Sequence, residues 1–387
     1  MKDLPKRLTQ YNQELASRGL RPICRRGFLK IATSTAAGML LPLSPSCGSE
    51  GSDTDDSRPD LKSGDQEDAA IGQTCPDCVT VGIAKENDIV RMVRTSIELT
   101  GGLDEIKGGD RVFIKPNISG PIPAICTNIE VVRGVIQAVK KFTDGKYITV
   151  AENSALGMNT EDIASGLGFI DLCEQEGVRF FVWESEEYQG FRDERWREIT
   201  EEKLVPRSLK EMSYDHFINV PVLKNHEKSL LYEIDLTCCM KNFVGLLHYQ
   251  GEGSRLSPAP FGIHNDKLGE QVAELGCIVP KTTMNVVDAT TICLQNGPAS
   301  LAEEDYYQAG LVLASQDRVA CDAVSMAVLK HFGDQNNIDR PYVTNSVLKN
   351  SQIKRAIELG LGVADPDLIE LVDSGVDEID GIKEKLS

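Results

Sequence analysis

The feature that most constrains the fold is a regular alternation of short apolar runs with helical patterns, which begins near residue 79. Strand-like runs such as "VTVGIA", "RVFIK", "ITVAEN" and "VRFFVW" alternate with amphipathic patterns such as "DIVRMVRTSIEL" and "NIEVVRGVIQAV". This alternation is typical of βαβ units, in which parallel strands pair and the connecting helices cover the sheet. The sequence therefore predicts an α/β fold with a largely parallel sheet and helices on both faces.

The pattern predicts one folded domain over residues 75–387, with an irregular polar segment at 184–213. That segment is either a hairpin excursion or the boundary between two lobes. Further strands are expected in "DHFINVPVL", "TMNVVDATTI" and "GLVLASQD". Helices are expected in "YEIDLTCCMKNFVGLL", from His264 to about Leu275, and in "RVACDAVSMAVLKHFG".

The N-terminal segment has the pattern of an export signal. Paired arginines in "CRRGFLK" precede an apolar stretch at 31–43 that is too short to span a bilayer comfortably. Residues 1–46 therefore resemble a twin-arginine signal peptide, which implies the twin-arginine translocation machinery as a partner. The expected location is the periplasm, either free or anchored to the membrane and facing it.

An acidic, Gly/Ser-rich tether is predicted at residues 47–74. Cys47 stands at its start, where it is either a lipid anchor or lies near an ordinary cleavage site. Membrane contact is expected only through that anchor. Because the twin-arginine route carries folded proteins, the signal favours a cofactor that is inserted before export, although fast folding or an escorting partner would explain it equally well.

The charge and the cysteine content limit the classes of ligand that the protein is expected to bind. The chain of 387 residues has 41 Lys and Arg against 59 Asp and Glu, a net charge of -18, which disfavours nucleic acid as a partner. Eleven cysteines include one C-x-x-C, Cys75 to Cys78, expected as a disulfide, with a redox dithiol or half of a metal site as alternatives. No ferredoxin-type run occurs, so the sequence gives little support for an iron–sulfur cluster.

Polar side chains follow the predicted strands at their carboxyl ends. These are Lys115 and Asn117, Glu152, Lys224 and His226, Asp288, and Asp317. Because ligands of parallel α/β sheets bind beyond the carboxyl ends of the strands, the residues are expected to meet in one crevice.

This set of residue types suits a small anionic substrate. Lys115, Lys224 and Lys241 can neutralise an anion, and a desolvated lysine can act as a base. His226, His264 and Glu152 are the candidate metal ligands, and Asn242, Gly245 and Asp288 the candidate cofactor-binding residues. A metal ion is the expected cofactor, of unknown identity. Structural roles are the alternatives: Asp317 as a helix N-cap, Asp322 paired with Arg318, and His264 as a structural hydrogen-bonding group.

The ordered motifs resemble the DUF362 family, a domain of unknown function, over roughly residues 79–375. They are "RVFIKPNISGP", "TNIEVVRGVIQAV", "ITVAEN", "FINVPVLKNHE", "CCMKNFVGLL", "MNVVDATTICLQNGP" and "LASQDRVACDAV". The resemblance implies recurrent Lys-x-Asn, Lys-x-His and Lys-Asn-x-x-Gly elements, which match Lys115 and Asn117, Lys224 and His226, and Lys241, Asn242 and Gly245. It implies no established reaction, and this chain lacks the ferredoxin module that carries iron–sulfur clusters in some members.

Two functions follow as hypotheses. The first is an exported, cofactor-dependent enzyme that binds a small anion at the strand ends and performs redox or proton-transfer chemistry, with Lys115, Asn117, Lys224, His226 and Lys241 as catalytic candidates. The second is a non-catalytic periplasmic binding or electron-transfer-associated protein, linked to iron–sulfur chemistry, that uses the same crevice. A closed pocket with perturbed lysines would favour the first.

Overall fold

The computed structural model describes residues 78–153, 159–226, 236–248, 266–297 and 302–387. The predicted signal peptide and tether, Cys75 and His264 lie outside these ranges. Asp77–Ser387 form one compact unit. No helix in the described ranges is both long and apolar enough to cross a bilayer.

An 11-stranded sheet forms the centre of this unit, and its main path has the order β13-β1-β12-β10-β7-β2-β3-β4. Short strands β8, β9 and β11 extend the sheet from β10. The strands are β1 (Val79–Ala84), β2 (Val112–Pro116), β3 (Ile148–Glu152), β4 (Arg179–Val182), β7 (His216–Val220), β8 (Val222–Asn225), β9 (Leu236–Thr237), β10 (Met284–Cys293), β11 (Tyr306–Tyr307), β12 (Leu311–Ser315) and β13 (Ile369–Asp373).

Most neighbouring strands on the main path are parallel, which confirms the predicted α/β class. Strand β10 pairs in parallel with β7, β7 with β2, β2 with β3, and β3 with β4. Strand β12 is the exception, because it runs antiparallel to both β1 and β10. The end of β12 therefore lies at the opposite edge of the sheet from the ends of β2, β3 and β7.

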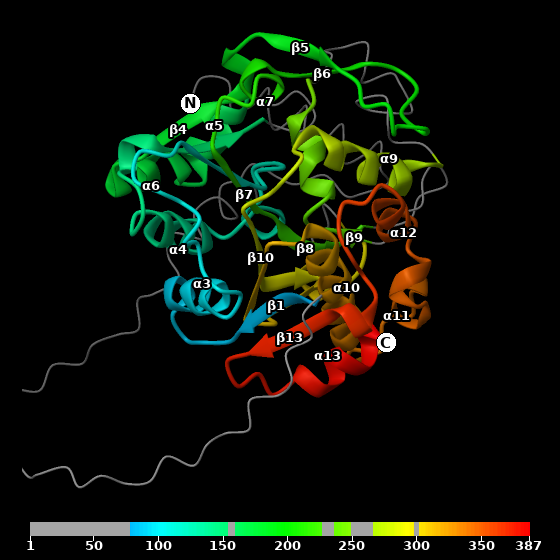
Figure 1. Ribbon diagram of the computed structural model, residues 1–387. Helices are drawn as coiled ribbons and strands as arrows, with labels where there is room; N and C mark the ends of the chain where they lie inside the picture. Colours follow the sequence, from blue (N-terminus) through cyan, green and yellow to red (C-terminus); the bar gives the residue numbers. More distant parts are fainter. Residues whose placement is uncertain (1–77, 154–158, 227–235, 249–265, 298–301) are drawn as a thin grey trace, which may run out of the picture. The chain divides into compact units, whose positions relative to one another are not determined.

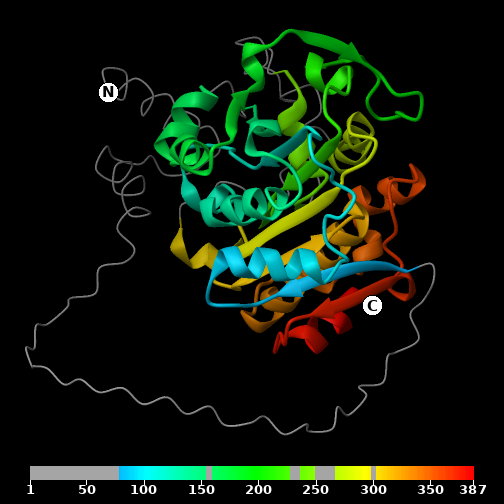
Figure 2. The same ribbon diagram turned by 60° about the vertical axis from the view of Figure 1, so that its left-hand side comes forward.

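Helices cover both sides of the sheet (Figures 1 and 2). Helices α3, α4 and α6 lie on one side and α10, α12 and α13 on the other. The helices are α3 (Ile89–Glu98), α4 (Ile129–Val139), α5 (Thr160–Gly166), α6 (Phe169–Glu176), α7 (Arg207–Lys210), α9 (Leu268–Leu275), α10 (Arg318–Gln335), α11 (Pro341–Thr344), α12 (Ser351–Glu358) and α13 (Ile379–Leu386).

Side chains cap the N-termini of helices α4 and α10. Asn128 caps α4 by accepting a hydrogen bond from the Glu130 N–H, as its position in the sequence suggests. Asp317 caps α10 in the same way. Helices α5 and α6 are separate because Gly168 adopts a left-handed conformation with φ of 86° between them.

The irregular segment forms a hairpin, β5 (Tyr188–Phe191) with β6 (Lys203–Pro206), in a separate two-stranded sheet. Glu274 of α9 anchors the loop between these strands. Its carboxylate accepts hydrogen bonds from the backbone N–H groups of 197–199 and from Arg355. A buried carboxylate with this many donors holds the loop against the main body.

Two secondary-structure predictions are wrong in informative ways. The run "FINVPVL" does not form one strand, because Pro221 lacks an N–H and separates β7 from β8. The described part of the predicted helix 232–247 contains β9 and a 3-10 helix, η5 (Lys241–Leu246). Lys224 and Asn225 are consequently part of a strand.

Candidate functional site

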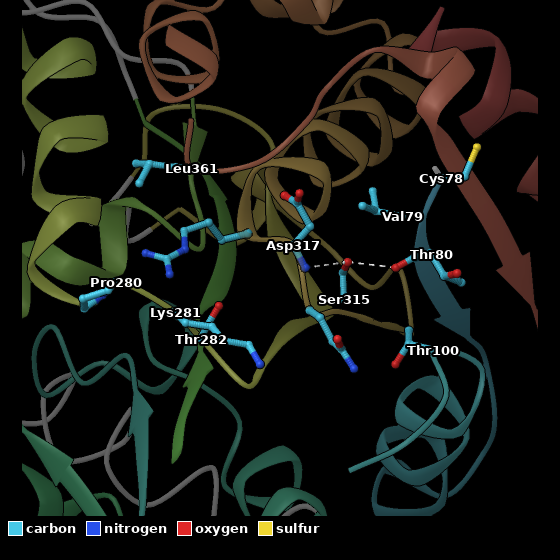
Figure 3. Close-up of a pocket in the computed structure, with 12 residues that line it drawn as sticks. Cys78, Val79, Thr80, Thr100, Pro280, Lys281, Thr282, Ser315, Asp317 and Leu361 are labelled. Atoms are coloured by element: carbon cyan, nitrogen blue, oxygen red, sulfur yellow. Dashed lines mark hydrogen bonds between the residues drawn. The ribbon is translucent and has the colours of Figure 1, made fainter. Parts of the chain in front are cut away.

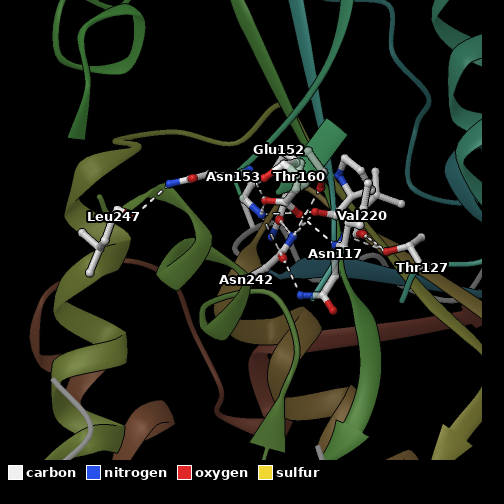
Figure 4. A network of polar contacts seen from close by, with 12 residues as sticks. Asn117, Thr127, Glu152, Asn153, Thr160, Val220, Asn242 and Leu247 are labelled. Atoms are coloured by element: carbon white, nitrogen blue, oxygen red, sulfur yellow. Dashed lines mark hydrogen bonds and ion pairs between the residues drawn. The ribbon is translucent and has the colours of Figure 1, made fainter. Parts of the chain in front are cut away.

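Lys115 and Glu152 form a buried ion pair at the ends of β2 and β3 (Figure 4). The Lys115 Nζ lies 2.7 Å from Glu152 Oε1, and the two side chains are 1% and 2% exposed. The carboxylate also accepts hydrogen bonds from the backbone N–H groups of Asn153 and Ile118, both at 2.9 Å. Both carboxylate oxygens are therefore already engaged.

Burial and charge act in opposite directions on this pair. Burial lowers the pKa of Lys115 and raises the pKa of Glu152, because each charged form loses water. The attraction between the two charges opposes both shifts, and the two backbone donors favour the ionised Glu152 carboxylate. The pair is thus neutralised within the protein, with no ligand needed.

Gly245 lies directly against this ion pair. A Cβ atom at that position would lie 2.9 Å from Glu152 Oε1 and 2.9 Å from Lys115 Nζ, closer than real Cβ contacts. The sequence suggested that this glycine lets the backbone approach a ligand. In the structure it lets the backbone of η5 approach the Lys115–Glu152 pair.

Lys224 of β8 is equally buried but has a different environment. Its Nζ donates hydrogen bonds to the backbone oxygen of Ile125 at 2.7 Å and to Asn117 Oδ1 at 3.1 Å. No carboxylate in the described ranges forms a salt bridge with it. Burial lowers the pKa of Lys224 to about 8.

Asparagine side chains join the two lysines. Asn242 Oδ1 accepts hydrogen bonds from Lys115 Nζ at 3.2 Å and from Asn117 Nδ2 at 3.1 Å. Asn117 Oδ1 then accepts from Lys224. These hydrogen bonds connect five side chains, which we name the lysine–asparagine network: Lys115, Asn117, Glu152, Lys224 and Asn242.

The network continues into the sheet through Asn219 of β7 and Asn285 of β10. Asn242 Nδ2 donates to Asn219 Oδ1 at 2.8 Å, and Asn219 Nδ2 donates to Asn285 Oδ1 at 3.2 Å. Asn285 Nδ2 in turn donates to the backbone oxygen of Ser315 at 3.1 Å. Sequence reasoning missed Asn219 and Asn285. An amide within an otherwise apolar strand was the available signal.

Backbone carbonyls decide which way each amide in this chain points. A carbonyl oxygen can only accept, so Nδ2 of Asn285 must face Ser315 O and Nδ2 of Asn219 must face Cys239 O, which lies 3.0 Å away. Each side-chain oxygen then faces the next amide in the direction of the lysines. The aligned amides direct their negative ends towards Lys115 and Lys224.

Asp288 lies beside Lys224 but does not end a strand, contrary to the sequence prediction. Strand β10 continues past it to Cys293. The Asp288 carboxylate accepts hydrogen bonds from Asn128 N at 2.6 Å and from Thr290 Oγ1 at 2.6 Å, and burial raises its pKa. Its charge favours the protonated Lys224 without forming a salt bridge to it.

The remaining candidate residues lie in different parts of the structure, and one of them is outside the described ranges. His226 is buried and follows β8 directly, and Lys241 is half-buried at the start of η5. His264 lies outside the described ranges. Asp317 does not belong to this set, because antiparallel β12 carries it to the opposite edge, where it caps α10. Asp322 accepts from Cys239 N, Met240 N and Gln352 and does not pair with Arg318 as the sequence suggested.

The donor set around Lys115 and Lys224 does not fit a metal ion. Two ammonium groups occupy it, and the oxygens around them already accept hydrogen bonds: Glu152 from Lys115, Asn153 and Ile118, Asn242 Oδ1 from Lys115, and Asn117 Oδ1 from Lys224. Metal ligands must present free lone pairs. Within the described ranges, this arrangement is suited to hold an anion and to move a proton.

A separate cavity of about 440 Å³ lies at the other edge of the sheet (Figure 3). Its lining includes Thr282, Ser315, Asp317 and Arg318. Asn285 reaches it from inside by donating to Thr282 Oγ1 at 2.9 Å. The chain of asparagines therefore extends from the lysines to the lining of this cavity.

The fold and the site together define an α/β protein in which buried lysines and amides meet beyond the carboxyl ends of parallel strands. Residues 112–327 match the family DUF362, described as a domain of unknown function. This match covers more than half of the chain, and the protein belongs to that family, as the sequence motifs indicated. No curated protein and no solved structure matches the chain.

Proposed function

We propose that this DUF362 protein is exported by the twin-arginine route and is an enzyme that binds a small anionic substrate at Lys224. Lys224 binds the anion as an ammonium group and exchanges a proton with it. Carboxylates and phosphates of low molecular weight are the substrate class. The network formed with Asn117, Asn242, Lys115 and Glu152 holds Lys224 in position.

One observation carries the proposal: Lys224 is 1% exposed and has no carboxylate partner in the described ranges. A buried ammonium without a counter-ion is unfavourable by several kcal/mol. Its two hydrogen bonds go to neutral oxygens and use two of its three N–H groups. An anionic ligand would supply the missing charge and the third acceptor.

The acidity of Lys224 fits proton transfer. A pKa of about 8 leaves a useful fraction of neutral amine near neutral pH, which an ordinary lysine does not provide. Lys115 lacks this property, because Glu152 already compensates its charge. Lys115 is therefore a positioning residue, which orients Asn242 and through it Asn117.

The first experiment titrates the full-length protein with acetate, oxalate and inorganic phosphate and follows its melting temperature. We expect at least one anion to stabilise the wild type by mass action and to have no effect on Lys224→Met. Lys281→Met is the matched control, because that lysine is 69% exposed, and it should respond like the wild type. An equal response from Lys224→Met would refute the assignment.

The pH dependence separates an enzyme from a binding protein. Anion affinity should fall as the pH rises above about 8, because Lys224 loses its charge. If Lys224 is a general base, turnover should instead rise through the same range, because the neutral amine is the active form. Anion binding without any turnover would support the non-catalytic alternative.

Export is supported by the paired arginines, Arg25 and Arg26, and by the apolar stretch that follows them. Replacement of both by lysine should leave folded protein in the cytoplasm, measured by fractionation of the cells. An unrelated periplasmic protein with a general secretory signal is the control for compartment integrity. Unchanged export of the double variant would show that the signal is of another type.

A further inference from the structure

A second cluster of reactive side chains lies away from the lysines, between the turn after β9 and helix α10. Cys238 and Cys239 of the turn and Asp322 of α10 are completely buried. One ligand atom from each residue lies within 4.8 Å of the others. We name these three residues the cysteine cluster.

The sulfur positions suit a single tetrahedral ion. The two Sγ atoms are 3.9 Å apart and are not bonded to each other. Two thiolates at about 2.3 Å from one zinc ion in tetrahedral geometry are separated by about 3.8 Å. Adjacent cysteines can thus share one ion here with little movement of the chain.

Asp322 is held in the orientation of a metal ligand. Its oxygens accept hydrogen bonds from Cys239 N at 2.6 Å, Met240 N at 3.2 Å and Gln352 Nε2 at 2.8 Å. Ligating carboxylates are usually supported by hydrogen bonds of this kind. Gln352 Oε1 is buried and has no hydrogen-bond partner among the described residues, so the polar groups here are incompletely satisfied.

Simple packing does not explain the carboxylate. Asp322 is 0% exposed and forms no salt bridge with any Lys or Arg in the described ranges. Buried cysteines are ordinary as small apolar residues, but a buried carboxylate beside them has only its hydrogen bonds to replace water, and a cation would compensate its charge as well. Burial raises the pKa of Asp322 and raises that of Cys238 to about 12.

We propose that Cys238, Cys239 and Asp322 bind one thiophilic divalent metal ion, with Zn²⁺ as the best fit. The ion displaces one proton from each thiol and any proton on Asp322, and those protons pass to solvent. Two thiolates and one carboxylate around Zn²⁺ carry a net charge of -1. Arg318 is buried one helical turn before Asp322 on α10, and its positive charge would offset this negative charge.

Cys321 also interacts with Cys239, but its thiol is not within 4.8 Å of all three ligand atoms. Because every ligand is buried, the ion must bind while the chain folds. It ties the turn after β9 to α10, and this turn leads into η5, which carries Asn242 and Gly245.

The test measures bound metal in full-length protein purified without chelators. The wild type should contain about one equivalent of zinc by mass spectrometry of the elements. Cys239→Ser and Asp322→Asn should contain little, whereas Cys173→Ser, which replaces a buried cysteine of α6, should retain it.

A second measurement covers variants that fail to fold. Wild-type protein produced with Co²⁺ in place of Zn²⁺ should show thiolate-to-cobalt charge-transfer absorption, and a chelator should remove it only under unfolding conditions. Metal-free, folded wild-type protein that takes up neither zinc nor cobalt on refolding would overturn the proposal. So would equal metal content in the wild type and a folded Asp322→Asn variant.

Discussion

Lys115 and Lys224 make a natural comparison, because both are 1% exposed and both donate to an asparagine of the same network. Lys115 faces a carboxylate at 2.7 Å. Lys224 faces a backbone carbonyl and an amide oxygen. The two lysines therefore share burial but differ in charge compensation.

Burial alone is therefore not enough to identify a functional lysine. Lys115 is compensated inside the protein, so its energetic role is structural, and its removal leaves a carboxylate without a partner. Lys224 lacks such compensation, so its charge is available to a ligand. Three substitutions test this difference in charge compensation.

The largest effect is expected from Lys115→Met. It leaves Glu152 buried without a cation, and loss of one partner from a buried pair costs about 3–5 kcal/mol in the free energy of unfolding. Urea denaturation at neutral pH measures it. The double variant Lys115→Met, Glu152→Gln should recover a large part of the loss, because neither charge remains. A loss under about 1 kcal/mol in the single variant would contradict the compensation argument.

Lys224→Met should have the opposite sign. The pKa of Lys224 falls from 10.5 to about 8 on folding. Between pH 8 and 10.5 the unfolded chain therefore binds more protons than the folded protein. Below about pH 8, Lys224 is charged in both states, and its burial destabilises the fold. Removal should stabilise the protein at pH 7 by about 1–3 kcal/mol, after the loss of two hydrogen bonds. The gain should shrink as the pH rises from about 8 towards 10.5.

Denaturation at several pH values tests this, with Lys281→Met as the control. That exposed lysine should show no such change with pH. A pH-independent destabilisation by Lys224→Met would mean that Lys224 is compensated in the same way as Lys115.

The smallest effect is expected from Gly245→Ala, which crowds the compensated pair. The added methyl would lie 2.9 Å from Lys115 Nζ and Glu152 Oε1, and such overpacking costs about 1 kcal/mol, the low end of the usual range, because the end of a lysine side chain can shift. Gly166→Ala in α5 is the matched control, because nothing lies within 4 Å of its Cβ position. It should be neutral or slightly stabilising. Equal effects at both positions would remove the steric argument.

The sequence was informative about the fold wherever local pattern determines structure. Apolar runs located β1, β2 and β3 correctly. Local sequence pattern gave the wrong secondary structure where contacts with distant residues determine it. Residues 236–247 have helical periodicity, but Leu236 and Thr237 pair with β8 and residues 241–246 form the 3-10 helix η5. The direction of β12 also has no local signal, because strand direction depends on its partners.

The site was predictable only in part. Placement at strand ends indicated that Lys115, Asn117 and Glu152 would lie together, and the structure places them together with Lys224 and Asn242. The sequence could not show that Glu152 neutralises one lysine and not the other, because that depends on distances across the sheet. Asn219 and Asn285 were missed for a similar reason, since they act within strands.

The pairing of β1 with both β13 and β12 has a consequence for the order of folding. Val79 pairs with Ile369, and Gly82 pairs with Ala314, so among the residues that the structure describes β1 pairs only with strands that come much later in the chain (Figures 1 and 2). During synthesis, β2, β3 and β4 can associate early, whereas β1 must wait unpaired until the C-terminal strands leave the ribosome. Contacts across such long sequence separations form slowly. Completion of this sheet is therefore a post-translational event, and any step that requires the finished protein must follow it.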